Sequence, residues 1–148
     1  MHLINICVFF NNLKNLATMA IESVSIWYSS LSTGIFEVDL QHSNIDQLIV
    51  LLERTKGEAR IKKSMDFLIH AIENHFKYEE WRFEDSSKKM NQMHINEHQR
   101  ILKKYYDLAN IVHVSNTEKI KNDILKMIKI VLKNHVKDFD CKFFQDAR

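Results

Sequence analysis

The sequence predicts an all-α fold: an antiparallel, up-down four-helix bundle preceded by an N-terminal arm. Its 148 residues contain only 2 Gly and no Pro, the residue types that tight turns need. From Asp39 onward, apolar residues recur at the 3.6-residue spacing of amphipathic helices, in four segments with short connections. Helices joined by short connections pack as antiparallel neighbours, so a bundle is expected.

The arm is expected to occupy the start of the chain, where residues 1–38 show no clean period and become extended around Trp27–Glu37. We divide the chain into an extension, residues 1–26, and a bundle domain, residues 27–148. Leu3–Phe10 is apolar, but no Lys or Arg precedes it, which disfavours a secretion signal. An alternative start at Met19 would make residues 1–18 an upstream extension, and the sequence leaves both starts open.

Four helices follow the arm. Their expected ranges are Leu40–Lys56, Glu58–Asp85, Lys89–Val112 and a last helix from after Ser115–Thr117 to about Lys137. Asp39 is the expected N-cap of the first helix. Gly57 fits the position that follows a helix end.

Each helix carries an apolar stripe, and the four stripes should form one core. They comprise Ile45, Leu48, Ile49 and Leu52; Met65, Leu68, Ile72, Phe76 and Phe83; Ile101, Leu102, Tyr105 and Leu108; and Ile120, Ile124, Met127, Ile128, Val131 and Leu132.

Overall composition excludes several classes of protein. The net charge of +2 gives no case for nucleic acid or an anionic membrane as a partner. No apolar run reaches the ~20 residues that span a bilayer. Two cysteines are too few for a disulfide framework, which favours a reduced, cytoplasmic compartment.

Polar residues interrupt the stripes on all four helices. By helical spacing, five imidazoles and one carboxylate face the core, namely His42, His75, Glu79, His94, His98 and His135, and a second carboxylate, Asp140, follows His135 by five residues. Burying these groups in an apolar interior is costly unless they are paired or bind metal. Seven donors are too many for one tetrahedral zinc, and they suit two ions of the iron class. Each motif is weak alone, but their coincidence on four helices predicts a metal centre.

The pairs His75/Glu79 and His94/His98 are four residues apart, so both members of a pair face one centre. His135 and Asp140 are five residues apart, which places them about 140° apart on a regular helix. We therefore expect the last helix to loosen, end or carry a π-bulge between them.

In this order, the segments TGIFEVDLQHSNIDQLI, HFKYEE, HINEH and HVKDFD resemble the hemerythrin family, specifically its single-domain bacterial members. Trp27 matches that family's N-terminal tryptophan, and the resemblance runs from there to about Phe144. It implies a four-helix bundle that holds two iron ions (Fe2+/Fe3+) with a bridging oxo or hydroxo group. Dioxygen would be the ligand.

The resemblance also implies a role for each residue. His94, His98 and His135 would hold one iron, His42 and His75 the other, and Glu79 and Asp140 would bridge the two. The second iron would keep an open position for dioxygen. Leu132, one turn before His135, is the candidate wall of the oxygen pocket, although a plain core role suits it equally.

The residues outside this set have simpler interpretations. Cys141 is expected to be a buried, inert thiol. Glu80 is expected to be surface charge. His2, His70 and His113 match no ligand position.

Three functions fit this centre. Reversible dioxygen binding, for transport, storage or delivery to an oxygen-using enzyme, is favoured because the donor set is rich in nitrogen. A di-iron oxidase, peroxidase or nitric-oxide-handling enzyme on the same scaffold is the alternative, although ferritin-like oxidases use more carboxylates. An oxygen or redox sensor is the third, disfavoured because few residues follow Asp140.

Overall fold

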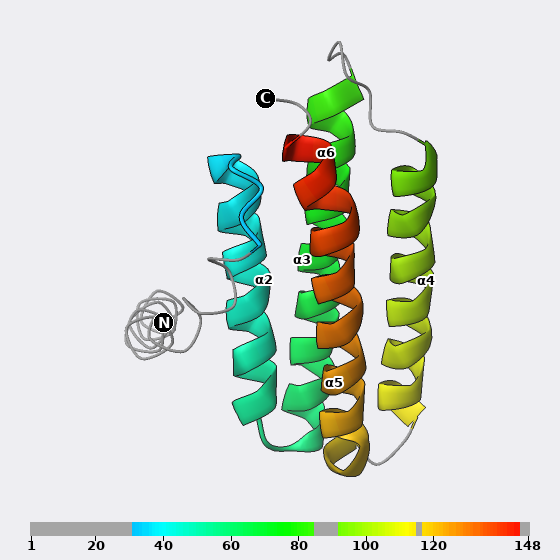
Figure 1. The fold of residues 1–148 in the computed structure, drawn as a ribbon. Helices are drawn as coiled ribbons and strands as arrows, with labels where there is room; N and C mark the ends of the chain where they lie inside the picture. The colour runs from blue at the N-terminus through cyan, green and yellow to red at the C-terminus, as the bar shows by residue number, and fades with distance from the viewer. Residues whose placement is uncertain (1–30, 85–91, 115–116, 146–148) are drawn as a thin grey trace, which may run out of the picture.

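The structure, a computed structural model, describes residues 31–84, 92–114 and 117–145. Four long helices run alternately up and down, side by side (Figure 1). They are α2 (Phe36–Arg54), α3 (Glu58–Glu84), α4 (Gln92–Val114) and α5 (Thr117–His135), and α5 continues through a π-helical turn η1 (Val136–Asp140) into α6 (Cys141–Gln145). Helix α2 packs against α3 and α5, and α4 packs against the same two helices. The predicted all-α four-helix bundle is confirmed.

The predicted arm and the domain boundary at residues 26 and 27 lie outside the described residues, as does Trp27. The described chain begins with five non-helical residues, 31–35. The described residues also exclude 85–91 and 115–116. The predicted end of one helix at Asp85 and the predicted start of the next at Lys89 therefore stay predictions.

Helix α2 begins four residues earlier than predicted, and Asp39 is not its N-cap. The cap position is Ile35, whose side chain makes no capping hydrogen bond. The carboxylate of Asp39, inside the first turn, instead accepts hydrogen bonds from the Ser32 hydroxyl at 2.6 Å and from the Thr33 N–H and hydroxyl, both at 2.8 Å. Asp39 therefore fastens the preceding segment onto the helix.

We expect Asp39→Ala to lower the free energy of unfolding by about 1–3 kcal/mol, because the donors of buried Thr33 lose a charged acceptor. Burial acts to raise the pKa of Asp39, but hydrogen bonds from Ser32, Thr33 and Gly34 outweigh it and lower the pKa. The contribution of Asp39 is therefore complete above its unfolded-state pKa of about 3.9 and is lost as the pH falls through the folded-state pKa.

Urea unfolding of both proteins from neutral pH downward tests this. The stability difference between wild type and Asp39→Ala should shrink in acid. A difference that stays constant at all pH values would contradict the assignment.

The connection between α2 and α3 confirms the glycine predicted to follow a helix end, but α2 ends earlier than predicted. Gly57 has φ +88°, the left-handed conformation expected after a helix end. Helix α2 ends at Arg54 rather than Lys56. The ammonium of Lys121 on α5 donates to the carbonyls of Glu53 and Thr55, both at 2.8 Å, and so satisfies acceptors at the end of α2.

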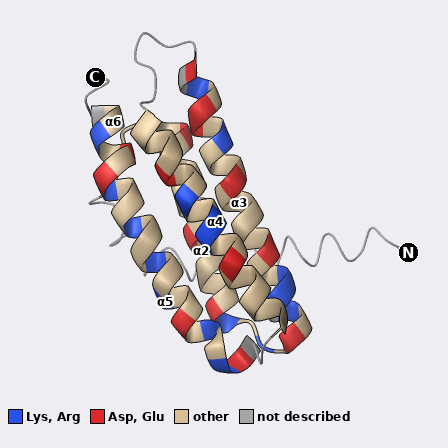
Figure 2. Ribbon diagram, turned by 90° about the vertical axis from the view of Figure 1, so that its right-hand side faces the viewer, with Lys and Arg blue, Asp and Glu red and all other residues tan. Residues whose placement is uncertain are grey.

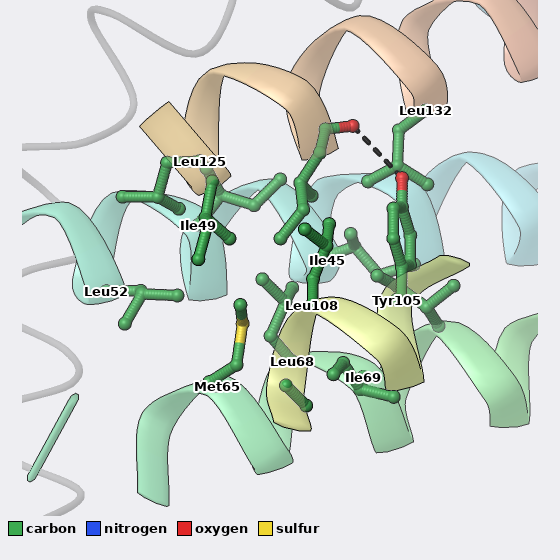
Figure 3. Close-up of a cluster of buried hydrophobic side chains, with 14 of the residues drawn as sticks. Ile45, Ile49, Leu52, Met65, Leu68, Ile69, Tyr105, Leu108, Leu125 and Leu132 are labelled. Carbon is green, nitrogen blue, oxygen red and sulfur yellow. Dashed lines mark hydrogen bonds between the residues drawn. The ribbon is translucent and has the colours of Figure 1, made fainter. Parts of the chain in front are cut away.

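The core fills the bundle between the helices, and nearly all predicted stripe residues are buried or partly buried in it (Figure 3). Met127 is an exception, since it is 37% exposed. Leu125 takes the inward position, together with Ile124 and Ile128, because α5 is rotated slightly from the predicted face. The side chain of Phe83 lies outside the described residues.

Tyr105 is the largest fully buried side chain among the described residues, and its hydroxyl donates to the carbonyl oxygen of Ile128 at 3.0 Å (Figure 3). We expect Tyr105→Phe to cost about 0.5–1.5 kcal/mol, the usual contribution of one hydrogen bond, because the ring itself is kept. Tyr106→Phe is the matched control: this hydroxyl bonds Glu73 from a side chain that is 46% exposed. Urea unfolding should show a smaller effect for the control, and equal losses would be a contrary result.

Basic and acidic residues are interspersed along α3, α4 and α5 in the view of Figure 2. Within the described ranges, no helix has the length and apolar character required to cross a bilayer.

Candidate metal centre

The structure brings the seven sequence-predicted donors into one buried site. His42 comes from α2, His75 and Glu79 from α3, His94 and His98 from α4, His135 from α5 and Asp140 from η1. None is more than 3% exposed. They occupy the half of the bundle where α2 and α4 begin and α3 and α5 end, the upper half in Figure 1.

The π-helical turn explains how His135 and Asp140 face the same centre. A π-helix closes its hydrogen bonds between residues five apart, so it accommodates the extra residue that a regular helix would turn away. Nε2 of His135 lies 3.1 Å from Oδ1 of Asp140. The predicted irregularity between these residues is confirmed, and η1 is its form.

Five of the residues form the first donor group. Glu79, His94, His98, His135 and Asp140 each offer one atom, and these atoms lie within 4.8 Å of one another. Nε2 of His94 is 2.9 Å from Oδ1 of Asp140, and Nε2 of His98 is 3.4 Å from Oε2 of Glu79. Three helices and η1 thus contribute to one metal-sized cluster.

The second donor group is His42, His75, Glu79 and Asp140, under the same 4.8 Å limit. Nε2 of His42 lies 3.1 Å from Nε2 of His75 and 3.3 Å from Oδ2 of Asp140. Two nitrogens bound at right angles to one ion, each about 2.1 Å away, would be roughly 3.0 Å apart. The two groups share Glu79 and Asp140, so these carboxylates are placed to bridge two ions.

The buried polar atoms fit a bound metal. Within the described part of the chain, neither carboxylate oxygen of Glu79 has a hydrogen-bond partner, nor has Nε2 of His98 or Oδ2 of Asp140. Leaving a fully buried carboxylate unsatisfied costs several kcal/mol. Cations placed between the two donor groups would satisfy these atoms together.

The electrostatics of the site favour metal-binding protonation states for the histidines. Burial, with nearby imidazoles adding to it, lowers the pKa of His75 to about 3 and that of His98 to about 2. Both rings are therefore neutral near pH 7, the form that binds metal.

The two carboxyl groups respond differently to their surroundings. Burial and the charge of Asp140 raise the pKa of Glu79 well above its ordinary value. Burial would also raise the pKa of Asp140, but His135, His42 and His94 hold it well below the usual range. Without a cation, the surroundings therefore favour the ionised form of Asp140 over that of Glu79, and bound cations would stabilise both carboxylates in their ionised form.

Two further residues contact the Nδ1 nitrogens of His75 and His98, here called the outer nitrogens of these rings. Oε1 of Gln41 lies 3.0 Å from Nδ1 of His75, and Oε1 of Glu80 lies 2.7 Å from Nδ1 of His98. Because a carboxylate or amide oxygen only accepts hydrogen bonds, each Nδ1 donates its N–H and each Nε2 keeps its lone pair for the centre. The prediction that Glu80 is surface charge is wrong: it is half-buried, and burial raises its pKa while His94 opposes the rise.

Aromatic rings, which the sequence did not single out as part of the site, line the five-donor group. Phe76 stacks on His98 with ring centroids 4.0 Å apart and planes 6° apart. Phe139 stacks on His135 at 5.5 Å. These apolar rings exclude water from the donors.

Leu132, the candidate pocket wall, is buried at 5% exposure one turn before His135 and belongs to the main core.

Among the described residues, Cys141, His70 and His113 belong to neither donor group. Cys141 is buried as predicted, its thiol donates to the Leu31 carbonyl at 3.4 Å, and burial raises its pKa. His70 is exposed, and His113 pairs with Asp66 at 2.9 Å on the surface. His2 lies outside the described residues.

Comparison with known proteins gives relatives of one kind. A bacteriohemerythrin from Pseudomonas paraeruginosa (strain DSM 24068 / PA7) is 25% identical over 126 residues, which cover 83% of this chain and 81% of the relative. Bacteriohemerythrins from Pseudomonas aeruginosa strains LESB58 and UCBPP-PA14 are 24% identical over the same shares. No family model matches, and no solved structure does. The extent of these matches, together with the buried His/Glu/Asp cluster of a four-helix bundle, supports a relationship of this chain to the hemerythrin family.

Proposed function

We propose that this protein binds dioxygen reversibly at a non-haem di-iron centre, as a carrier, store or delivery protein. The observation that carries the proposal is the pair of overlapping donor groups, which share Glu79 and Asp140. In this assignment, one iron is held by His94, His98 and His135, and the other by His42 and His75. Glu79 and Asp140, which belong to both donor groups, would be ligands of both ions. A bound iron pair supplies two exchangeable electrons and a coordination position for dioxygen.

The difference between the two donor groups supports a binding site at one end of the centre. The group around His94, His98 and His135 offers five protein donors, whereas the group around His42 and His75 offers four. The four-donor position therefore has more room for an added ligand.

Binding is favoured over oxidation by the donor set and its surroundings. Five imidazoles and two carboxylates differ from the carboxylate-rich sets of ferritin-like oxidases. Phe76 and Phe139 cover the histidine rings with apolar surface, and Leu132 is proposed as a wall of the oxygen pocket. A water-free pocket limits proton supply and so slows irreversible oxidation. A cytoplasmic location is part of the proposal, supported by the 2 cysteines in the sequence.

The proposal is tested by oxygen cycling. Iron-loaded protein is reduced without oxygen, exposed to air and deoxygenated again, while its visible absorption is followed. We expect a charge-transfer band that appears with air and disappears on deoxygenation through repeated cycles. Rapid, irreversible conversion to a ferric form, or steady consumption of an added reductant, would instead favour the oxidase.

A further inference from the structure

The outer nitrogens of two ligand-candidate histidines have partners of different charge. His98, in the five-donor group, has the carboxylate of Glu80 at 2.7 Å from its Nδ1. His75, in the four-donor group, has the neutral amide oxygen of Gln41 at 3.0 Å from its Nδ1. These two histidines, one from each donor group, are therefore supported by different charges from outside the donor set.

The contacts of His98 are the more complete. Glu79 and Glu80 are consecutive residues of α3, yet they face opposite nitrogens of the same imidazole: Glu79 lies 3.4 Å from Nε2, and Glu80 lies 2.7 Å from Nδ1. Phe76, one turn earlier on α3, stacks on the ring face at 4.0 Å. Three side chains of α3 thus fix the position, the tilt and the tautomer of a histidine that belongs to α4.

A carboxylate on the outer N–H of a histidine does more than orient it. Partial transfer of the proton toward the carboxylate makes the imidazole a stronger electron donor, which stabilises the more highly charged state of a bound metal. A neutral amide oxygen orients the ring but adds no charge. The effect should therefore be larger at His98 than at His75.

We propose that Glu80 is a positioning residue that holds His98 for metal binding and, through its charge, makes the position held by His94, His98 and His135 the one that better stabilises Fe3+. The inference rests on the proposed di-iron function. It assigns the five-donor position as the more reducing of the two.

The first experiment separates the hydrogen bond from the charge. Anaerobic binding of Fe2+ is measured by competition with a chelator for wild type, Glu80→Ala, Glu80→Gln and Glu84→Gln. Glu84 is exposed one turn further along α3, so its variant removes the same charge away from His98. We expect Glu80→Ala to weaken Fe2+ binding about 10–100-fold, the usual effect of removing a partner of a metal-bound histidine. Glu80→Gln keeps an acceptor oxygen and should restore most of the affinity.

The second experiment measures the midpoint potentials of the iron-loaded proteins by mediated titration, in which each Fe2+ that becomes Fe3+ gives one electron to the mediator. Glu80→Gln should shift a midpoint potential to a more positive value, while Glu84→Gln should leave the potentials unchanged. Gln41→Glu, which adds a charge behind His75, should shift a potential in the opposite direction. If Glu80 had only a structural role, Glu80→Gln would leave the midpoint potentials at their wild-type values.

The outcomes are distinct. Wild-type potentials in Glu80→Gln, or wild-type Fe2+ affinity in Glu80→Ala, would overturn this inference while leaving reversible oxygen binding intact. Failure of the wild-type protein to bind Fe2+ would instead overturn the proposed function. Circular dichroism checks that each variant keeps its helices, and should Glu80→Ala unfold, the potential of Glu80→Gln decides.

Discussion

His42→Ala is expected to lower the iron content to about one ion per chain, since metal sites bind weakly once a donor is lost. His42 belongs to the four-donor group alone. Its Nε2 lies 3.1 Å from that of His75, so its loss leaves that position with a single imidazole. The five-donor position keeps every one of its protein donors.

Glu79→Ala is expected to have a larger effect, because Glu79 belongs to both donor groups. Iron content should fall well below one ion per chain after desalting, since both positions lose a charged ligand. The ordering of the two variants is specific to a shared, bridging carboxylate.

His70→Ala is the matched control for the histidine variant, since His70 is exposed on α3. Iron is measured by elemental analysis of protein loaded with Fe2+ without oxygen, and circular dichroism confirms that the variants are folded. Unchanged iron in His42→Ala and Glu79→Ala would contradict the ligand assignment. So would equal losses in His70→Ala.

Removal of the metal is expected to lower the melting temperature by roughly 8–16 °C. A metal present at a thousand times its dissociation constant adds about 4 kcal/mol to stability. Each kcal/mol shifts the melting temperature of a domain of this size by roughly 2–4 °C. The physical cause is the set of buried donors, above all the two oxygens of the Glu79 carboxyl group, which have no hydrogen-bond partner among the described residues and which a cation would bind.

Thermal unfolding followed by circular dichroism, with and without a strong chelator, measures this difference. The Glu79→Ala protein is the control, since a chelator should hardly change its melting temperature. If loss of the metal left the wild-type melting temperature unchanged, the buried donors would have to be satisfied within the protein.

The sequence predicted the arrangement of the site because helical spacing is a local property. Residues four apart share a helix face wherever the helix lies, so the spacing was enough to pair His75 with Glu79 and His94 with His98. The five-residue step from His135 to Asp140 breaks that rule, which predicted an irregularity between them, and a π-bulge was one of the three forms left open before the structure showed the π-helical turn.

Features that depend on how helices sit against one another were missed. The contact of Glu80 with His98 joins α3 to α4, and its sequence signal is no different from that of any exposed glutamate. Gln41 reaches His75 across α2 and α3 in the same way. The start of α2 was misplaced because Asp39 resembles an N-cap, while its carboxylate binds the segment in front of the helix.

Anomalous X-ray diffraction at the iron absorption edge, on crystals of iron-loaded protein, tests the central claim most directly. Two iron peaks are expected, one among His94, His98 and His135 and the other beside His42 and His75, with Glu79 and Asp140 between them. A single peak, no peak within this cluster, or iron bound only at surface histidines would contradict the assignment.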